Sequence, residues 1–289
     1  MSKKILLIFG LITFLSLSAK EPITFKLWDN VAPPSDNGLT PENEVMENPG
    51  WISLVATPEL TIYPAENPNG TTLLMCPGGG YSGVAIGHEG NALAAPLNDV
   101  GITVAVLKYR MPNGHYQVPA EDVSRAFEIL MENSSEFGIN PERIGIGGAS
   151  AGGHLASTVA THKTSDSFIP AFQFLLYPVI SMEEGVTHQG SRDNLLGLEP
   201  SEELVNYYSN QLQVTPETPP AFIALSGDDM VVPVKNSLDY IQALTDNGIP
   251  VSLHLYPTGG HGWGYKPDFK YFNMWVPEFL FWIDNLFKE

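Results

Sequence analysis

A serine and a histidine in this chain have the types and the order needed for nucleophilic catalysis. Ser150 is the centre of residues 148–152 (GASAG), which fit the G-x-S-x-G pattern of a nucleophile on a sharp strand-to-helix turn. In a chain with 27 glycines, that pattern alone also fits a serine in an ordinary tight turn. His261 follows in a glycine-rich segment. A serine hydroxyl needs a base to remove its proton, so we interpret Ser150 as the nucleophile and His261 as its base.

The base in turn needs a carboxylate that holds its tautomer and stabilises the imidazolium. Asp228 and Asp229 both lie between Ser150 and His261 in the sequence. Asp229 opens an Asp-x-x-Val-Pro segment that leads into the next expected helix, so we favour Asp229 as the acid. The other aspartate is expected to be solvated or to cap a helix.

A glycine run after an apolar strand is suited to stabilising an oxyanion. Residues 77–81 (PGGGY) follow the expected strand 72–76. Acyl transfer passes through a tetrahedral oxyanion that needs preorganised backbone N–H donors, and glycine lets the backbone approach closely. Gly79, Gly80 and Ala151 are the predicted donors.

Residues 78–83 also match G-x-G-x-x-G, the dinucleotide-binding pattern. Such a loop should open a helix at once, but residues 87–90 (GHEG) interrupt. The following strand should end in an acid for the ribose, yet residues 108–110 are Lys-Tyr-Arg. We therefore predict no nucleotide cofactor.

Strands and helices are expected to alternate, which predicts the α/β class with a mostly parallel sheet covered on both faces. Apolar runs predict strands near residues 60–63, 72–76, 102–109, 172–180, 221–226 and 251–256. Residues 144–156 predict a short apolar strand, a glycine-rich turn at Ser150 and a small-residue helix. Helical spacing predicts helices near residues 91–100, 119–133, 233–247 and 272–287. Residues 20–60 are expected to wrap the surface, and residues 182–219 to form a small insertion or lid. The glycine run, the serine, the aspartates and the histidine then all follow strand ends at one edge of the sheet.

Composition restricts the partners. The 289 residues carry a net charge of −18, which argues against nucleic acid and anionic membranes as partners and is compatible with neutral substrates. Cys76 is the single cysteine, so no internal disulfide can form, and we expect a small buried side chain. No cluster has metal-ligand spacing, so we predict no metal. The oligomeric state is not indicated.

The N-terminus is typical of a signal peptide. A basic start with Lys3 and Lys4 precedes an apolar run over residues 5–17, which is too short to span a bilayer, and small residues follow. We expect residues 1–19 to be removed on export to the periplasm or the medium, leaving a single domain over residues 20–289 without integral membrane association.

Several segments together resemble a known group of enzymes. They are residues 77–81 (PGGGY), 88–90 (HEG), 107–110 (LKYR), 148–155 (GASAGGHL), 229–233 (DMVVP) and 259–263 (GGHGW). The chain resembles the exported α/β-hydrolase esterases of polysaccharide-degrading bacteria, which include acetylxylan-esterase-like and feruloyl-esterase-like proteins, some labelled xylanase. The resemblance covers about residue 25 to the C-terminus. It implies an α/β-hydrolase fold with a triad of Ser150, Asp229 and His261; the histidine that usually opens the glycine loop is replaced by Pro77.

Three residues near the expected site are candidate substrate contacts. Tyr81 and Trp263 flank it and have rings that either stack on a sugar or only wall the pocket. Glu89 is either a substrate contact or a local stabiliser near a helix start.

The insertion and the elbow helix add further polar residues. His188, Ser191 and Arg192 lie in the insertion as candidate substrate contacts, with a structural ion pair as the alternative for Arg192. His154 follows the elbow and is interpreted as a packed, hydrogen-bonded histidine.

These features predict a serine esterase that removes acetyl groups from plant cell-wall carbohydrate through an acyl-enzyme. The alternatives are a feruloyl or aryl esterase, a peptidase of the prolyl-oligopeptidase type, and a non-catalytic carbohydrate-binding homologue. The sequence leaves the acyl group, the sugar and the position of the ester open.

Overall fold

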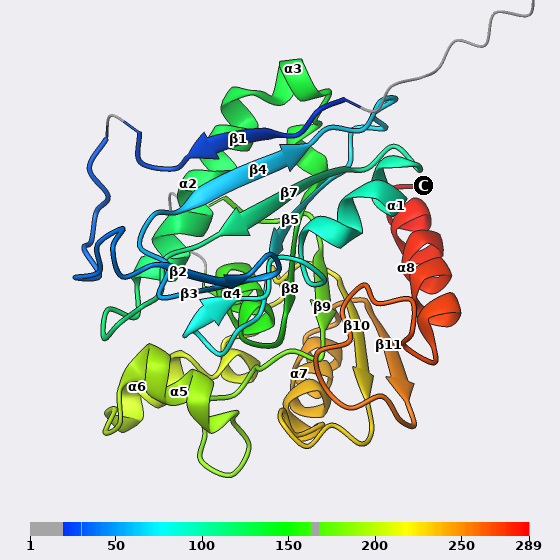
Figure 1. Ribbon diagram of the computed structural model, residues 1–289. Coiled ribbons are helices and arrows are strands. Elements are labelled where there is room, and N and C mark those ends of the chain that lie inside the picture. Colours follow the sequence, from blue (N-terminus) through cyan, green and yellow to red (C-terminus); the bar gives the residue numbers. More distant parts are fainter. Residues whose placement is uncertain (1–19, 30, 163–167, 289) are drawn as a thin grey trace, which may run out of the picture.

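The computed structural model describes residues 20–29, 31–162 and 168–288 of the chain. Its centre is an eight-stranded sheet with the order β1-β4-β7-β5-β8-β9-β10-β11 (Figure 1). The six strands from β7 to β11 in this order run parallel, whereas β4 is antiparallel to both β1 and β7. The predicted α/β class with a mostly parallel sheet is confirmed.

The strands of this sheet are β1 (Ile23–Lys26), β4 (Glu59–Tyr63), β5 (Thr72–Cys76), β7 (Thr103–Lys108), β8 (Ile144–Ala149), β9 (Gln173–Leu176), β10 (Ala221–Ser226) and β11 (Val251–Tyr256). The helices are α1 (Ala94–Asn98), α2 (Val118–Glu132), α3 (Ser134–Phe137), α4 (Ser150–Thr161), α5 (Gln189–Leu196), α6 (Glu202–Tyr207), α7 (Lys235–Asp246) and α8 (Phe272–Leu286). Short 3₁₀ turns are η1 (Asn91–Leu93), η2 (Pro141–Arg143) and η3 (Asn210–Leu212).

The central strands are continuous apolar runs because both of their faces are covered. Every residue of β5, β7, β8, β9 and β10 is buried. Neighbouring residues of β9 show the two layers: Gln173 accepts a hydrogen bond from Tyr240 of α7, whereas the Phe174 ring packs on Phe279 of α8. Helices α7 and α8 therefore lie on opposite faces of the sheet, and this core fixes the strand ends that carry the site.

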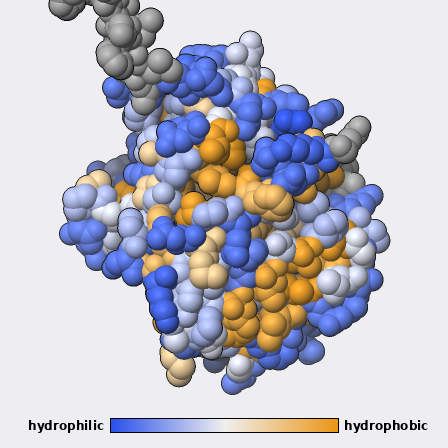
Figure 2. All heavy atoms as spheres, turned by 90° about the vertical axis from the view of Figure 1, so that its right-hand side faces the viewer, coloured by the Kyte–Doolittle hydropathy of each residue, from blue (hydrophilic) through white to orange (hydrophobic). Residues whose placement is uncertain are grey.

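The last strand, β11, is only partly covered. Leu253 and Leu255 of β11 and Met274 and Phe281 of α8 are exposed. Figure 2 shows a broad apolar area on the side of the molecule that carries these two elements. This end of the sheet is therefore less shielded than its centre.

The N-terminal segment differs from the expectation that residues 20–60 only wrap the surface. It contributes β1 to the main sheet, and β2 (Val45–Asn48) and β3 (Trp51–Ser53) to a second, three-stranded sheet with β6 (Gly83–Val84). These strands are two to four residues long, and β1 and β2 are mostly exposed, so they lack the apolar runs that predicted the others. The small sheet packs against the glycine run through β6.

Two further expectations concern the insertion over residues 182–219 and the signal peptide over residues 1–19. The predicted insertion is present as α5, α6 and η3, between β9 and β10. The predicted signal peptide, residues 1–19, lies outside the described residues. No helix within the described ranges is long and apolar enough to cross a membrane.

Candidate active site

Ser150 lies where β8 ends and α4 begins, on a strained turn. Its φ is +52°, a left-handed conformation that a residue with a side chain rarely adopts. A Cβ on Gly148 would lie 2.0 Å from the Gly152 carbonyl oxygen, and a Cβ on Gly152 would lie 2.0 Å from that of Cys76. The close approach of these backbones explains why the residues two before and two after the serine are glycines.

Three residues from three strand ends form a continuous hydrogen-bonded chain. The Ser150 hydroxyl lies 2.8 Å from His261 Nε2, and His261 Nδ1 lies 2.7 Å from Asp229 Oδ2. Because a carboxylate can only accept, Nδ1–H donates to Asp229, which leaves Nε2 as the acceptor for the serine hydroxyl. This arrangement can move a proton from the serine to the imidazole.

The two aspartates have different partners. Asp229 Oδ1 accepts hydrogen bonds of 2.9 Å from the Val231 and Val232 amides, in addition to the bond from His261. Burial opposes its charge, but the His261 contact and the two amides outweigh burial and lower the pKa of Asp229 below its ordinary value. Asp228 is exposed and accepts from the Gly260 amide at 2.8 Å, so it holds the histidine loop and does not touch the imidazole.

The glycine run lies against the serine, and its peptide planes are anchored from behind. The Gly78 carbonyl accepts from the Ala85 amide at 2.8 Å, and the Gly79 carbonyl accepts from the Ser82 amide at 3.0 Å. All peptide bonds in the described chain are trans, so the N–H groups of Gly79 and Gly80 point away from these anchors. Neither N–H donates to a protein acceptor in the part of the chain that is described.

The third predicted donor, Ala151, lies in the first turn of α4, where amides have no partner within the helix. The structure thus brings together Ser150, Asp229, His261 and the glycine run at one edge of the sheet.

Gly83 lies in β6 and does not open a helix, so the loop lacks the geometry of a dinucleotide-binding turn.

Glu89 belongs to the support of this loop, which favours the alternative of a local stabiliser over that of a substrate contact. Its side chain is buried; Oε2 accepts from the Gly78 amide at 2.8 Å, and Oε1 accepts from the Tyr177 hydroxyl at 2.8 Å. Tyr177 in turn accepts from the Gly264 amide at 2.7 Å. Sequence reasoning missed Tyr177, because this residue lies within the expected strand over residues 172–180, whereas β9 ends at Leu176.

Tyr81 and Trp263 are buried behind the surface of the site, and neither ring presents a face to a sugar. Tyr81 is 2% exposed, and its ring lies edge-on to the His154 ring. Trp263 is 4% exposed, and its ring stacks on Phe269 with 4.3 Å between centroids. Burial therefore favours the alternative that both rings only form walls over the alternative that they stack on a sugar.

His154 is a packed histidine, as predicted. Its Nε2 lies 2.8 Å from the Tyr208 carbonyl oxygen and must donate, so Nδ1 accepts from the Tyr81 hydroxyl at 2.8 Å. Complete burial lowers the pKa of His154 to about 4. Cys76 is also buried, which raises the pKa of its thiol, and it contacts none of the candidate catalytic atoms as a hydrogen-bond partner.

The insertion is held to the body of the protein by polar contacts. Arg192 Nε donates to the Met182 carbonyl at 3.0 Å, and its guanidinium lies 4.0 Å from Asp193. These contacts favour the structural alternative for Arg192 over a substrate contact. Asn194 Nδ2 donates to the Gly80 carbonyl at 2.8 Å, a link between α5 and the glycine run that the sequence did not indicate.

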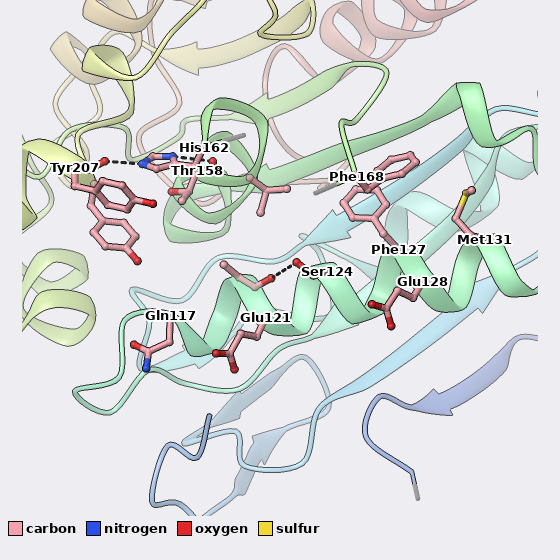
Figure 3. A pocket seen from close by; sticks show the side chains of 13 residues that line it. Gln117, Glu121, Ser124, Phe127, Glu128, Met131, Thr158, His162, Phe168 and Tyr207 are labelled. Atoms are coloured by element: carbon pink, nitrogen blue, oxygen red, sulfur yellow. Dashed lines mark hydrogen bonds between the residues drawn. The ribbon is translucent and has the colours of Figure 1, made fainter. Parts of the chain in front are cut away.

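A cavity of about 430 Å³ lies elsewhere, between α2, α4 and the end of α6 (Figure 3). Ser150, Asp229 and His261 are not among its lining residues. Two of its polar side chains have partners within the protein: His162 is hydrogen-bonded to the Tyr207 and Thr158 carbonyls, and Glu121 accepts from Ser35. This cavity is therefore separate from the serine site.

Comparison with known proteins agrees with this geometry. Residues 73–264 match a family model described as the alpha/beta hydrolase fold. An acetylxylan esterase of Xylanibacter ruminicola is 38% identical over 79% of this chain, and an endo-1,4-beta-xylanase B of Butyrivibrio fibrisolvens is 35% identical over 70%. The matches span only 48% and 34% of those two proteins. A solved acetyl ester-xyloside bifunctional hydrolase of Caldicellulosiruptor lactoaceticus is 36% identical, with a TM-score of 0.78 over 91% of this chain and 96% of its own.

Proposed function

The chain belongs to the α/β-hydrolase family, and on this premise we propose that it is a serine esterase that removes acetyl groups from plant cell-wall carbohydrate. The observation that carries the proposal is the continuous chain from Asp229 through His261 to the Ser150 hydroxyl. It lies beside the unpartnered amides of the glycine run. A nucleophile, a base, an orienting acid and oxyanion donors are the parts that ester hydrolysis needs.

In the acylation step, Ser150 Oγ attacks the ester carbonyl carbon while His261 Nε2 takes the hydroxyl proton. The carbonyl oxygen becomes an oxyanion, and the amides of Gly79, Gly80 and Ala151 stabilise it. Collapse of this intermediate breaks the bond to the alcohol oxygen. His261 returns the proton to that oxygen, so the sugar leaves as a neutral alcohol and the acyl group stays on Ser150.

In the deacylation step, a water molecule replaces the alcohol. His261 removes a proton from the water, whose oxygen attacks the acyl-enzyme carbonyl through the same oxyanion site. The proton passes back to Ser150 Oγ as the acid leaves. Asp229 remains ionised throughout, because its hydrogen bonds keep its pKa low, and it stabilises the imidazolium in both steps.

The acetyl group and the carbohydrate alcohol are supported by the relatives. One is named an acetylxylan esterase and another an acetyl ester-xyloside bifunctional hydrolase. The chain spans about half the length of the first, so the comparison supports the activity of the shared domain. The strongly negative net charge is compatible with a neutral carbohydrate substrate.

We also propose that the protein is exported to the periplasm or the medium. The support is the basic start and the apolar run over residues 5–17. N-terminal sequencing of the protein recovered from those fractions tests this, and a retained Met1 would contradict it.

The experiment for the proposed function is release of acid from defined esters. Purified protein is incubated with acetylated and with feruloylated xylo-oligosaccharides, and acetate and ferulate are measured. We expect acetate release, and we expect Ser150→Ala to abolish it while circular dichroism stays unchanged. Full hydrolysis by the Ser150→Ala variant would refute the mechanism, and exclusive release of ferulate would refute the acyl specificity.

A further inference from the structure

His188 holds an unused hydrogen-bond donor beside the proposed oxyanion site. It is the N-cap of α5, and its Nδ1 accepts from the Ser191 amide at 3.2 Å. An amide N–H can only donate, so Nδ1 carries no proton and the neutral ring must carry its proton on Nε2. Nε2–H has no hydrogen-bond partner among the described residues.

The imidazole of His188 lies against the glycine run. A Cβ placed on Gly80 would lie 3.7 Å from His188 Cε1, with nothing else within 4 Å. The ring is close enough to the catalytic pair for the charges of His261 and Asp229 to act on it. Partial burial and the charge of His261 lower the pKa of His188, so the ring is a neutral donor.

We propose that His188 is a specificity-determining residue, whose Nε2–H donates a hydrogen bond to a hydroxyl or ring oxygen of the sugar that carries the ester. This inference rests on the proposed esterase function. An acetyl group has one polar atom, the carbonyl oxygen, and the amides of Gly79, Gly80 and Ala151 bind it. A further neutral donor at this place therefore has its acceptors on the alcohol side of the ester, where a sugar is rich in oxygen atoms.

Asn194 lies on the same helix and provides the contrast. Its side chain donates to the Gly80 carbonyl at 2.8 Å, so it holds the glycine run itself. Loss of this bond should affect every ester, whatever its alcohol. Loss of the His188 donor should affect only esters whose alcohol offers an acceptor.

The test compares two acetyl esters in the full-length protein: monoacetylated xylo-oligosaccharide and phenyl acetate, whose aryl alcohol carries no oxygen other than that of the ester bond. The variant is His188→Asn, because an asparagine oxygen still caps α5 while the side chain is too short to replace Nε2–H. We expect kcat/KM for the oligosaccharide to fall about tenfold and that for the aryl ester to stay within about twofold.

Asn194→Ala is the matched variant and should lower kcat/KM for both esters to a similar degree. An equal fall for both esters in His188→Asn, or no fall for either, would overturn the role of His188. The melting temperatures of His188→Asn and His188→Gln are measured as well. A melting temperature close to that of the wild type indicates a lost contact, whereas a lower one indicates a disturbed helix. A wild-type protein that cleaves the aryl ester but not the acetylated oligosaccharide would instead refute the proposed carbohydrate substrate, and the inference with it.

Discussion

The Tyr177 hydroxyl donates a 2.8 Å hydrogen bond to Glu89 Oε1, and both side chains are buried. Through this bond the glycine run, held by Glu89 at the Gly78 amide, is connected to the histidine loop, held by Tyr177 at the Gly264 amide. The Tyr177 ring also lies 4.7 Å from the His261 ring. The oxyanion donors and the base are thereby tied to one rigid element at the end of β9.

Tyr177→Phe should remove this connection, because Glu89 Oε1 and the Gly264 amide would both lose the hydrogen bond to the tyrosine hydroxyl. We expect a loss of about 1–3 kcal/mol in the free energy of unfolding, and a lower kcat with little change in KM, because positioning and not substrate binding is affected. Urea unfolding and steady-state kinetics measure the two effects.

Tyr256→Phe is the control, because the Tyr256 hydroxyl donates to Glu278 and contacts no member of the triad. It should lower stability without lowering kcat. Equal kinetic effects of the two tyrosine variants would show that the Glu89–Tyr177 bond has no special influence on the site.

Asp229→Asn should lower kcat on the order of 10³–10⁴-fold, because the amide group favours the wrong imidazole tautomer and no longer stabilises its charge. Asp228→Asn keeps an oxygen that can accept from the Gly260 amide, so its kcat should fall by less than about tenfold. Stopped assays on the same ester compare the two variants. A larger loss of kcat in Asp228→Asn than in Asp229→Asn would show that Asp228, and not Asp229, is the acid.

Gly152→Ala should destabilise the protein by about 3 kcal/mol or more, because the added methyl would lie 2.0 Å from the Cys76 carbonyl oxygen and 2.5 Å from that of Pro77. These are backbone atoms and cannot rotate away. Gly50→Ala is the matched control, since its methyl would have no neighbour closer than 3.6 Å. Thermal melts of both variants measure the difference, and similar melting temperatures would show that the elbow has room to relax.

Much of the fold was predictable because strand interiors and the elbow follow local rules. The apolar runs predicted β5, β10 and β11 to the residue, and small-residue spacing located the turn at Ser150. β1, β2 and β3 were missed because strands of three or four residues carry little local pattern and depend on the strands they pair with.

The site was predictable only where chemistry restricts the residue type. Ser150 and His261 could be found in this way, because few side chains can act as nucleophile and base. Tyr177 and Asn194 could not, since they act through contacts with Glu89 and Gly80 that only folding creates. For the same reason the sequence left open whether the rings of Tyr81 and Trp263 stack on a sugar or only wall the pocket, and their burial in the fold favours the second alternative.

His154 should make the stability of the protein depend on pH. Its pKa is about 4 in the folded protein and 6.5 in the ordinary state, because the buried imidazole is held neutral. The unfolded chain therefore binds the proton more readily between these values. The contribution of His154 is fully present above pH 6.5 and is lost as the pH falls toward 4, by about 3 kcal/mol in total.

His154→Gln tests this dependence, because glutamine can accept from Tyr81 and donate to the Tyr208 carbonyl but does not titrate. Urea unfolding is measured from pH 8 to pH 5 for the wild type and the variant. Other histidines with lowered pKa, such as His162, are present in both proteins, so the difference between the curves reports His154 together with its electrostatic interaction with His162. We expect the wild-type free energy of unfolding to fall more steeply below pH 6.5, whereas parallel curves would show that His154 is not held neutral.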